Sequence, residues 1–276
     1  MAFSQRKIEY KTNGQILKMR EAGLVLAEAL DEAVSAAQIG VTTAHLDAVF
    51  ASVLERHGAT SNFKGYHGFP ATICASVNEE VVHGFPSEYV LGDGDVLKID
   101  GGAIIDGWHA DSARTVIVGT AAAEDQRLSD ITQEAMWRGI AALAEARFVG
   151  QIGDAIDDFV SGVPGAPLGI LEDYVGHGIG SEMHQAPDVL NYRTGHRGAR
   201  VKPGMCLAIE PMLVRGGLET KVLADDWTVV TVDGQRASQW EHSVAVHMGG
   251  IWVLTAHDGG AAGLAPFGVV PSPIVS

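Results

Sequence analysis

Two aspartates near residue 100 have the spacing of a cation-binding pair on a β-hairpin. Apolar runs flank Asp106 and Gly107, and an Asp-Gly pair between such runs is a strong signal for a two-residue hairpin turn. A turn at that point places Asp100 and Asp111 diagonally opposite each other on one face. Neighbouring carboxylates on a buried face cannot both stay charged without a cation. The segment 96–118 alone therefore predicts either a metal site or a bulged, mobile hairpin with a solvated carboxylate.

Three residues of the second half can complete an oxygen-rich site. Glu210 ends the apolar run LAIE, Glu241 lies in SQWEHSVAV, and His177 lies between glycines in GHGIG. Carboxylates are seldom buried unless they are paired or bound to a cation. The glycine run does not complete G-x-G-x-x-G, because Ser181 stands at the last position, so a phosphate-binding loop is disfavoured. Four carboxylates and one imidazole suit two divalent first-row ions held ~3.5–4 Å apart.

The chain also repeats itself weakly. Residues 94–100 and 204–210 share the pattern G-x-x-L-x-I-acid, and residues 83–86 and 184–187 share H-x-x-P. Both matches occur in the same order, which predicts two related halves that face each other. Each half then offers a histidine and a strand-borne carboxylate, and a site between the halves would receive ligands from both.

The composition limits the class of protein. The 276 residues are 46% hydrophobic and carry a formal charge of −15, with a pI near 5.0. This length suits one large domain with an ample core, and the acidic balance argues against a nucleic-acid partner. No apolar run reaches the length of a membrane span, and the first residues lack the apolar segment of a signal peptide. Cys74 and Cys206 lie outside any CxxC motif, which is typical of the reducing cytoplasm.

The hydrophobic periodicity predicts helices and strands in both halves. Helices are expected after the capping residues Thr12 and Thr42, and over residues 124–146 and 152–161. Strands are expected over residues 202–213, 227–232 and 239–247, the last two joined by an Asp-Gly turn at 233–234. We expect an N-terminal extension at 1–13, one catalytic domain at 14–255 and a surface tail at 256–276.

Five motifs lie in order along residues 14–250: GYHGFPATICASVNEEVVHGFP, IDGGAIIDGWHADSARTVIVG, GHGIGSEMHQAPDVLNY, GMCLAIEPM and WEHSVAV. On these motifs the chain resembles the type I methionine aminopeptidases of bacteria. The resemblance implies the pita-bread fold, an α+β fold with a two-layer α/β arrangement. In this fold two pseudo-twofold halves form a curved, mainly antiparallel sheet that helices cover.

The resemblance also implies roles for individual residues. Two divalent metal ions (Co, Mn, Fe, Zn or Ni) are expected on five ligands, of which Asp111 and Glu241 bridge both ions: Asp100, Asp111, His177, Glu210 and Glu241. Glu210 is expected to act as the general base, with His83 and His184 as catalytic histidines in the substrate cleft. A pocket for the methionine side chain is expected from Tyr66, Phe69, Cys74, Met183 and Trp227. A monovalent cation held by backbone carbonyls near Asn78 is a further feature of the family.

The implied activity is removal of the N-terminal methionine from nascent proteins and peptides with a small second residue. The resemblance implies a cytoplasmic monomer that associates transiently with the ribosome and binds neither nucleic acid nor membrane. Phe63, Phe69 and Met183 depart from the residues common in the family, so the pocket shape should differ. Two alternatives are a proline-specific aminopeptidase of the same fold and a non-catalytic binding protein, which should lack several of the five ligands.

Overall fold

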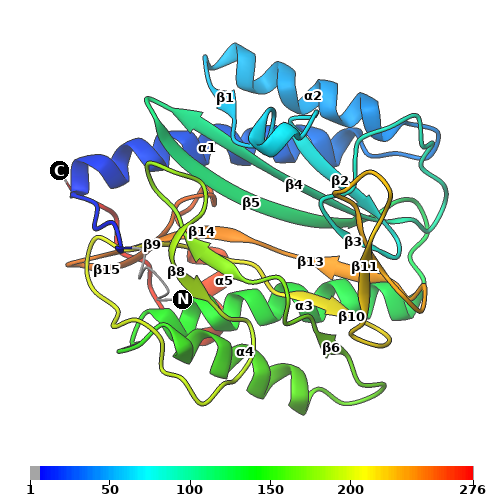
Figure 1. The fold of residues 1–276 in the computed structure, drawn as a ribbon. Coiled ribbons are helices and arrows are strands. Elements are labelled where there is room, and N and C mark those ends of the chain that lie inside the picture. The colour runs from blue at the N-terminus through cyan, green and yellow to red at the C-terminus, as the bar shows by residue number, and fades with distance from the viewer. Residues whose placement is uncertain (1–6, 276) are drawn as a thin grey trace, which may run out of the picture.

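Strands in the middle of the molecule lie between two layers of helices (Figure 1). We describe residues 7–275 of a computed structural model. The helices α1 (Asn13–Ala36) and α2 (Thr43–Arg56) cover one side, and α3 (Ala123–Leu143) and α4 (Gly150–Gly162) cover the other. The predicted α+β class and the helix-covered sheet are therefore confirmed. None of the described helices combines the length and apolar character that a membrane crossing requires.

The first two helices begin at the predicted capping residues. Thr12 and Gln15 form a reciprocal capping box at the start of α1, and the Thr42 side chain accepts the His45 N–H at the start of α2. The apolar stripe of α1 is buried against the sheet. This packing gives the first half an apolar core of its own, which extends from α1 and α2 to the neighbouring strands.

The predicted hairpin is the central feature of the first sheet. The sheet contains β1 (Thr60–Ser61), β2 (Ile73–Val77), β4 (Val96–Ile105) and β5 (Trp108–Ile117). Asp100 pairs with Ala113 and Gly102 pairs with Asp111, which is the register that a two-residue turn dictates. Both turn residues have positive φ, +50° at Asp106 and +78° at Gly107, as a type I′ turn requires.

The second half contains a five-stranded sheet in the order β15-β14-β9-β7-β8. Its strands are β7 (Gly176–Gly178), β8 (Gln185–Val189), β9 (Cys206–Ile209), β14 (His242–His247) and β15 (Gly250–Val253). The sequence repeat is visible in the structure, because Gly94 and Gly204 both have positive φ and each precedes a strand of the repeat, β4 or β9. The second half has its own apolar core under α3 and α4.

Two small sheets complete the fold. One has the order β13-β10-β6, with β6 (Gly169–Ile170), β10 (Met212–Val214) and β13 (Ala237–Gln239). The other has the order β11-β12-β3, with β3 (Glu80–Val82), β11 (Thr220–Val222) and β12 (Val229–Thr231). A 3₁₀ turn, η1 (Tyr66–Gly68), precedes β2.

Three strand predictions are wrong in detail. The run 202–213 is two strands, β9 and β10, because Pro211 has no N–H for a ladder. The run 239–247 is interrupted at Trp240 and Glu241, where β13 ends and β14 begins. The strand predicted over 227–232 shortens to β12, and the Asp-Gly turn at 233–234 joins it to β13 of a different sheet, so no hairpin forms there.

Residues beyond 255 pack against the second half. The helices α5 (Ala261–Leu264) and η2 (Ala265–Phe267) lie there, and Leu264 is fully buried in the second core. A side chain added at Gly263 would collide with the Trp137 ring, since its Cβ would lie 2.3 Å from ring atoms. This packing differs from the surface tail expected at 256–276, because the low-complexity sequence does not reveal that Leu264, Val269 and Ile274 contact apolar cores.

The two halves meet along one edge of β5. We define the central seam as residues 111–115 of β5 facing residues 239–243. Across it, the Ser112 hydroxyl donates to Glu241 O at 2.6 Å, and the Glu241 N–H donates to Ala113 O at 3.2 Å. The Thr115 hydroxyl donates to Gln239 O at 2.6 Å. The central seam therefore fixes carboxylate-bearing strands of the two halves against each other.

Candidate metal centre and substrate pocket

Five predicted ligands come together where the halves meet. Asp100 lies on β4, Asp111 on β5 and His177 on β7, whereas Glu210 follows β9 and Glu241 precedes β14. All five are buried, with exposed fractions of 9% or less. The two interruptions that the strand prediction missed are thus the places where the glutamates leave their ladders and enter the site.

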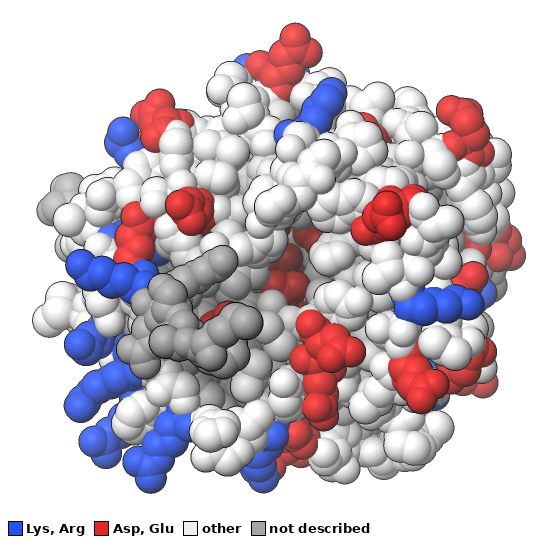
Figure 2. Space-filling view, in the orientation of Figure 1, with Lys and Arg blue, Asp and Glu red and all other residues white. Residues whose placement is uncertain are grey.

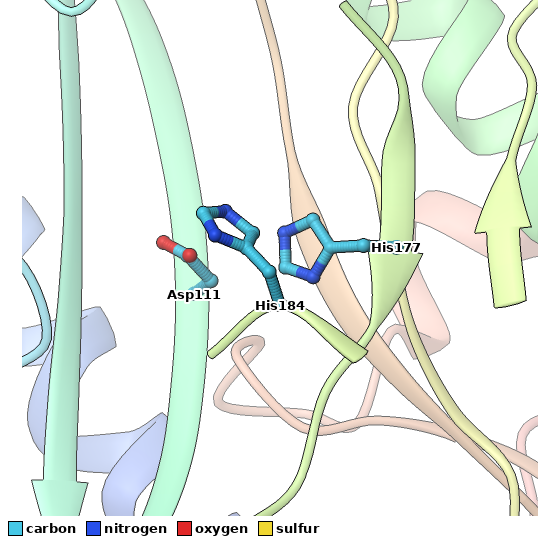
Figure 3. A group of neighbouring side chains, drawn as sticks. All are labelled: Asp111, His177 and His184. Carbon is cyan, nitrogen blue, oxygen red and sulfur yellow. The ribbon is translucent and has the colours of Figure 1, made fainter. Parts of the chain in front are cut away.

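Ligand atoms of these residues form three overlapping groups. Within each group, one atom per residue lies within 4.8 Å of the others: Asp100, Asp111 and Glu241; His177, Glu210 and Glu241; Asp111, His177 and His184. Asp111, His177 and Glu241 each belong to two of these groups. In Figure 3 the Asp111 carboxylate lies beside the His184 ring, and the His177 ring projects from another strand on the other side of His184.

The carboxylates of this site are buried close together, and Arg114 offsets part of the charge of Glu241. Burial raises the pKa of Asp100 to about 7. Burial, followed by repulsion from neighbouring carboxylates, raises the pKa values of Asp111, Glu210 and Glu241 well above the ordinary range. Within the described residues, Asp100 Oδ1, Asp111 Oδ1 and Glu241 Oε1 are buried without a hydrogen-bond partner. Buried anionic oxygens of this kind fit divalent cations.

His177 presents one ring nitrogen to the carboxylates. Its Nδ1 lies 3.0 Å from the Gly178 carbonyl, which can only accept, so Nδ1 carries the hydrogen. Its Nε2 lies 3.5 Å from Glu210 Oε1. Burial, together with His184, lowers the pKa of His177 to about 3. The neutral ring therefore directs the Nε2 lone pair into the site, as a metal-binding imidazole does.

The two predicted catalytic histidines line the same cavity from opposite halves. His184 Nδ1 lies 2.9 Å from the Tyr66 hydroxyl, and its ring centroid is 4.4 Å from that of His177. The His83 ring lies 6.2 Å from Trp227, centroid to centroid. Burial, and then His184, lowers the pKa of His83 to about 4, so this ring is neutral near pH 7.

The predicted pocket residues form one apolar cluster beside the carboxylates: Tyr66, Phe69, Cys74, Met183 and Trp227. The Phe69 ring packs edge-on against Trp227 at 5.2 Å between centroids. The cavity has a volume of about 190 Å³, several times the roughly 30 Å³ of one liquid water. In Figure 2 acidic side chains are visible inside a hollow near the middle of the face.

Cys74 belongs to the pocket wall and is a poor nucleophile. The thiol is buried, and burial raises its pKa well above the ordinary value, with Asp100 and Asp111 adding to the effect. A nucleophilic cysteine needs the opposite environment, one that lowers the thiol pKa.

Two further residues line the cavity, Phe63 and Val82. Phe63 packs edge-on against Phe69 with 6.2 Å between ring centroids. Phe63 is one of the three residues from which a changed pocket shape is expected. Val82 has no chemical signal beyond its position directly before His83.

Comparisons with known proteins agree with this geometry. The model of "Metallopeptidase family M24" matches residues 17–248. The chain is 40% identical over 245 residues to methionine aminopeptidase 1 of Bacillus subtilis, covering 89% of this chain and 98% of that protein. It is 43% identical over 255 residues to methionine aminopeptidase 1 of Mycobacterium tuberculosis, covering 91% and 96%. The crystal structure of methionine aminopeptidase from Thermotoga maritima superposes with a TM-score of 0.87 at 35% identity, covering 91% of this chain and all of that one. The predicted fold is thereby confirmed.

Proposed function

Because the chain belongs to metallopeptidase family M24, we propose that it is a methionine aminopeptidase, which removes the N-terminal methionine of peptides and nascent proteins. The observation that carries this proposal is the convergence of four buried carboxylates and one imidazole beside an apolar pocket. A binding protein without catalysis is disfavoured, since none of the five ligands is replaced.

We assign Asp100, Asp111, His177, Glu210 and Glu241 as the residues that would hold the metal ions. Two divalent ions held here would polarise the substrate carbonyl and lower the pKa of water. The carboxylate-rich ligand set suits several first-row ions, so cobalt, manganese, iron, zinc and nickel are all candidates.

Three side chains act on the substrate. The Glu210 carboxylate takes a proton from the attacking water as the general base. We assign the Tyr66 hydroxyl, 2.9 Å from His184 Nδ1, as the donor, which places the hydrogen of the neutral ring on its other nitrogen. That N–H donates to the carbonyl oxygen as negative charge develops on it. His83 contacts the scissile amide nitrogen and assists its departure.

The pocket explains the choice of the first residue. Tyr66, Phe69, Cys74, Met183 and Trp227 surround the first side chain with aromatic rings and sulfur atoms. A flexible thioether packs well in such surroundings. A small second residue is preferred because the enclosed site leaves little room beyond the scissile bond. We place the activity in the cytoplasm, on nascent chains during transient ribosome association, by a monomer.

The test compares two matched substitutions on one hairpin. Protein treated with chelator should be inactive on Met-Ala-Ser and should regain activity when divalent metal is restored. Asp111→Asn should lose nearly all activity in the restored protein, because it removes a carboxylate of the metal site. Asp106→Asn should retain activity, since Asp106 is an exposed turn residue and asparagine tolerates its positive φ.

Two outcomes would contradict the proposal. Full activity of Asp111→Asn would remove the two-metal assignment. Faster cleavage of Ala-Pro-Ser than of Met-Ala-Ser would favour the proline-specific alternative.

A further inference from the structure

A lysine lies inside the apolar strand that carries Asp100. Lys98 is fully buried, and strand alternation places it on the same face as Asp100. Its neighbours Leu97 and Ile99 point the other way, into the core under α1 and α2. A buried amine of this kind needs acceptors.

Backbone carbonyls supply those acceptors. Lys98 Nζ lies 2.9 Å from Asn78 O and 3.3 Å from Val96 O. The Asn78 oxygen also accepts the Ala237 N–H at 3.1 Å, and the Val96 oxygen also accepts the Asn78 N–H at 2.8 Å. A carbonyl oxygen has two lone pairs, so each of these oxygens is fully used. Lys98 Nζ therefore occupies the position from which a cation would contact these carbonyls.

The junction at Asn78 connects the strands that carry site residues. Asn78 has a φ of +56° in the turn between β2 and β3. Its side chain bonds Asp95 Oδ1 at 2.8 Å and accepts the Val96 N–H at 3.0 Å. From this junction β3 leads to His83 and β13 leads to Glu241. Its geometry thus influences both sides of the cavity.

The lysine is not required by the strand itself. In the sequence repeat, Lys98 corresponds to Ala208 of the second half, which is also fully buried. The same strand pattern therefore forms around a small apolar residue. The charged residue is therefore particular to the first half, where the turn at Asn78 packs against Lys98.

We propose that the Lys98 side chain replaces the monovalent cation that the family resemblance implies near Asn78, so that this chain needs no K⁺ or Na⁺ there. Lys98 is a positioning residue: it holds the β2–β3 turn and β13 against β4 and does not touch the substrate. The chain carries its own cation in place of an exchangeable ion.

The test measures thermal unfolding in KCl, NaCl and choline chloride at equal ionic strength, with excess Mn²⁺ to keep the carboxylates occupied. The wild-type Tm should be the same in all three salts. Lys98→Ala should lower the Tm in choline chloride by at least about 4 °C. K⁺ or Na⁺ should restore part of that loss in a saturable manner, because the truncation opens space beside the carbonyls.

Two variants serve as controls. Lys98→Met fills the same space without a charge, so K⁺ and Na⁺ should not restore its Tm. Leu97→Ala creates a cavity on the opposite face of the same strand and should lose stability equally in every salt.

A wild-type Tm that rises selectively with K⁺ or Na⁺ would overturn the proposal, and this measurement does not depend on any variant folding. A Lys98→Ala protein that equals wild type in choline chloride, or that K⁺ and Na⁺ fail to restore, would overturn it as well. Because the readout is Tm, failure here is distinguishable from failure of the proposed peptidase activity.

Discussion

Asp111 and Ser243 bind each other reciprocally across the central seam. The Asp111 N–H donates to Ser243 Oγ at 3.0 Å, and the Ser243 hydroxyl donates to Asp111 O at 2.8 Å. Ser243 is fully buried and belongs to the opposite half. The backbone position of a carboxylate-bearing residue is thus set by a hydroxyl 132 positions later in the chain.

Ser243→Ala should therefore weaken both folding and metal binding. Leaving the Asp111 amide without this acceptor should lower the free energy of unfolding by about 1–3 kcal/mol. Metal affinity should fall by roughly tenfold to hundredfold, as for other groups that orient ligands. Urea unfolding and calorimetric titration measure the two effects. The control is Ser52→Ala, an exposed serine bonded only to Val49 O of its own helix; equal losses in both variants would contradict the role of the seam.

His184→Ala should slow turnover rather than weaken substrate binding. If His184 stabilises the developing oxyanion, kcat on a Met-Ala peptide should fall by roughly 10²–10³ with KM little changed. Tyr66→Phe should produce a smaller loss in kcat, because it removes only the hydroxyl at His184 Nδ1. Steady-state kinetics separates the parameters, with the exposed His45→Ala as control. A raised KM with unchanged kcat would assign His184 to ground-state binding.

Metal binding should release protons and strengthen with rising pH. In the metal-free fold Asp100 has a pKa of about 7, and burial raises the pKa values of the other three carboxyls well above their ordinary range. A raised carboxyl pKa means that the folded protein binds more protons than the unfolded chain. The stability that these groups contribute is therefore lost as pH rises from about 4 through their folded pKa values. Metal requires the ionised form. The difference in unfolding free energy between metal-loaded and metal-free protein should therefore grow with pH.

Calorimetry of metal binding in two buffers with different ionisation enthalpies counts the protons directly. Net release at pH 7 is expected, and Asp111→Asn should release fewer protons than wild type. His83 and Lys98 are not ligands, so their titration contributes equally to the unfolding free energy of metal-loaded and metal-free protein. Their contribution therefore drops out of the difference between the two. Absence of proton release on metal binding would show that the carboxyls are already ionised in the metal-free fold.

The first residue of the substrate should be selected by burial. Burying a methionine side chain is worth ~1.5–3 kcal/mol, which gives roughly tenfold to hundredfold preference for Met over Ala in kcat/KM. Lys should be excluded more strongly, because the pocket offers no partner for its charge. Tripeptides that differ only at the first position measure this, and Phe69→Ala should reduce cleavage of the Met peptide more than of the Ala peptide. Equal kcat/KM for Met, Ala and Lys would refute the pocket assignment.

The hairpin of Asp100 and Asp111 is predictable because its register depends on local chemistry. Asp106 and Gly107 both accept positive φ, and a turn of two such residues fixes every pair along β4 and β5. The helix starts at Thr12 and Thr42 are predictable for the same reason, because each side chain accepts a hydrogen bond from an N–H of the adjacent helical turn.

Elements whose structure depends on contacts with the opposite half cannot be predicted from the local sequence. The hydrophobic run around Glu241 continues without a break in the sequence. In the structure, however, the Glu241 N–H donates to Ala113 O across the central seam, outside any ladder of its own half. The turn at residues 233–234 has the same Asp-Gly pair as the hairpin. It is held instead by the Thr231 hydroxyl on Gln235 O at 2.7 Å, and its flanking strands join separate sheets. Lys98 was detectable only as a charge in an apolar run, since its acceptors lie on a separate turn.

The two separate apolar cores have a consequence for what counts as the smallest working unit. The first core lies within residues 22–118 and the second within residues 128–264, and two smaller apolar clusters join residues of both halves. Neither half holds a full ligand set, because Asp100 and Asp111 lie in one and His177, Glu210 and Glu241 in the other. Catalysis therefore requires the two halves to dock against each other. If the connection near residue 120 were cut, recovered peptidase activity would serve as a complementation signal for reassembly of the halves.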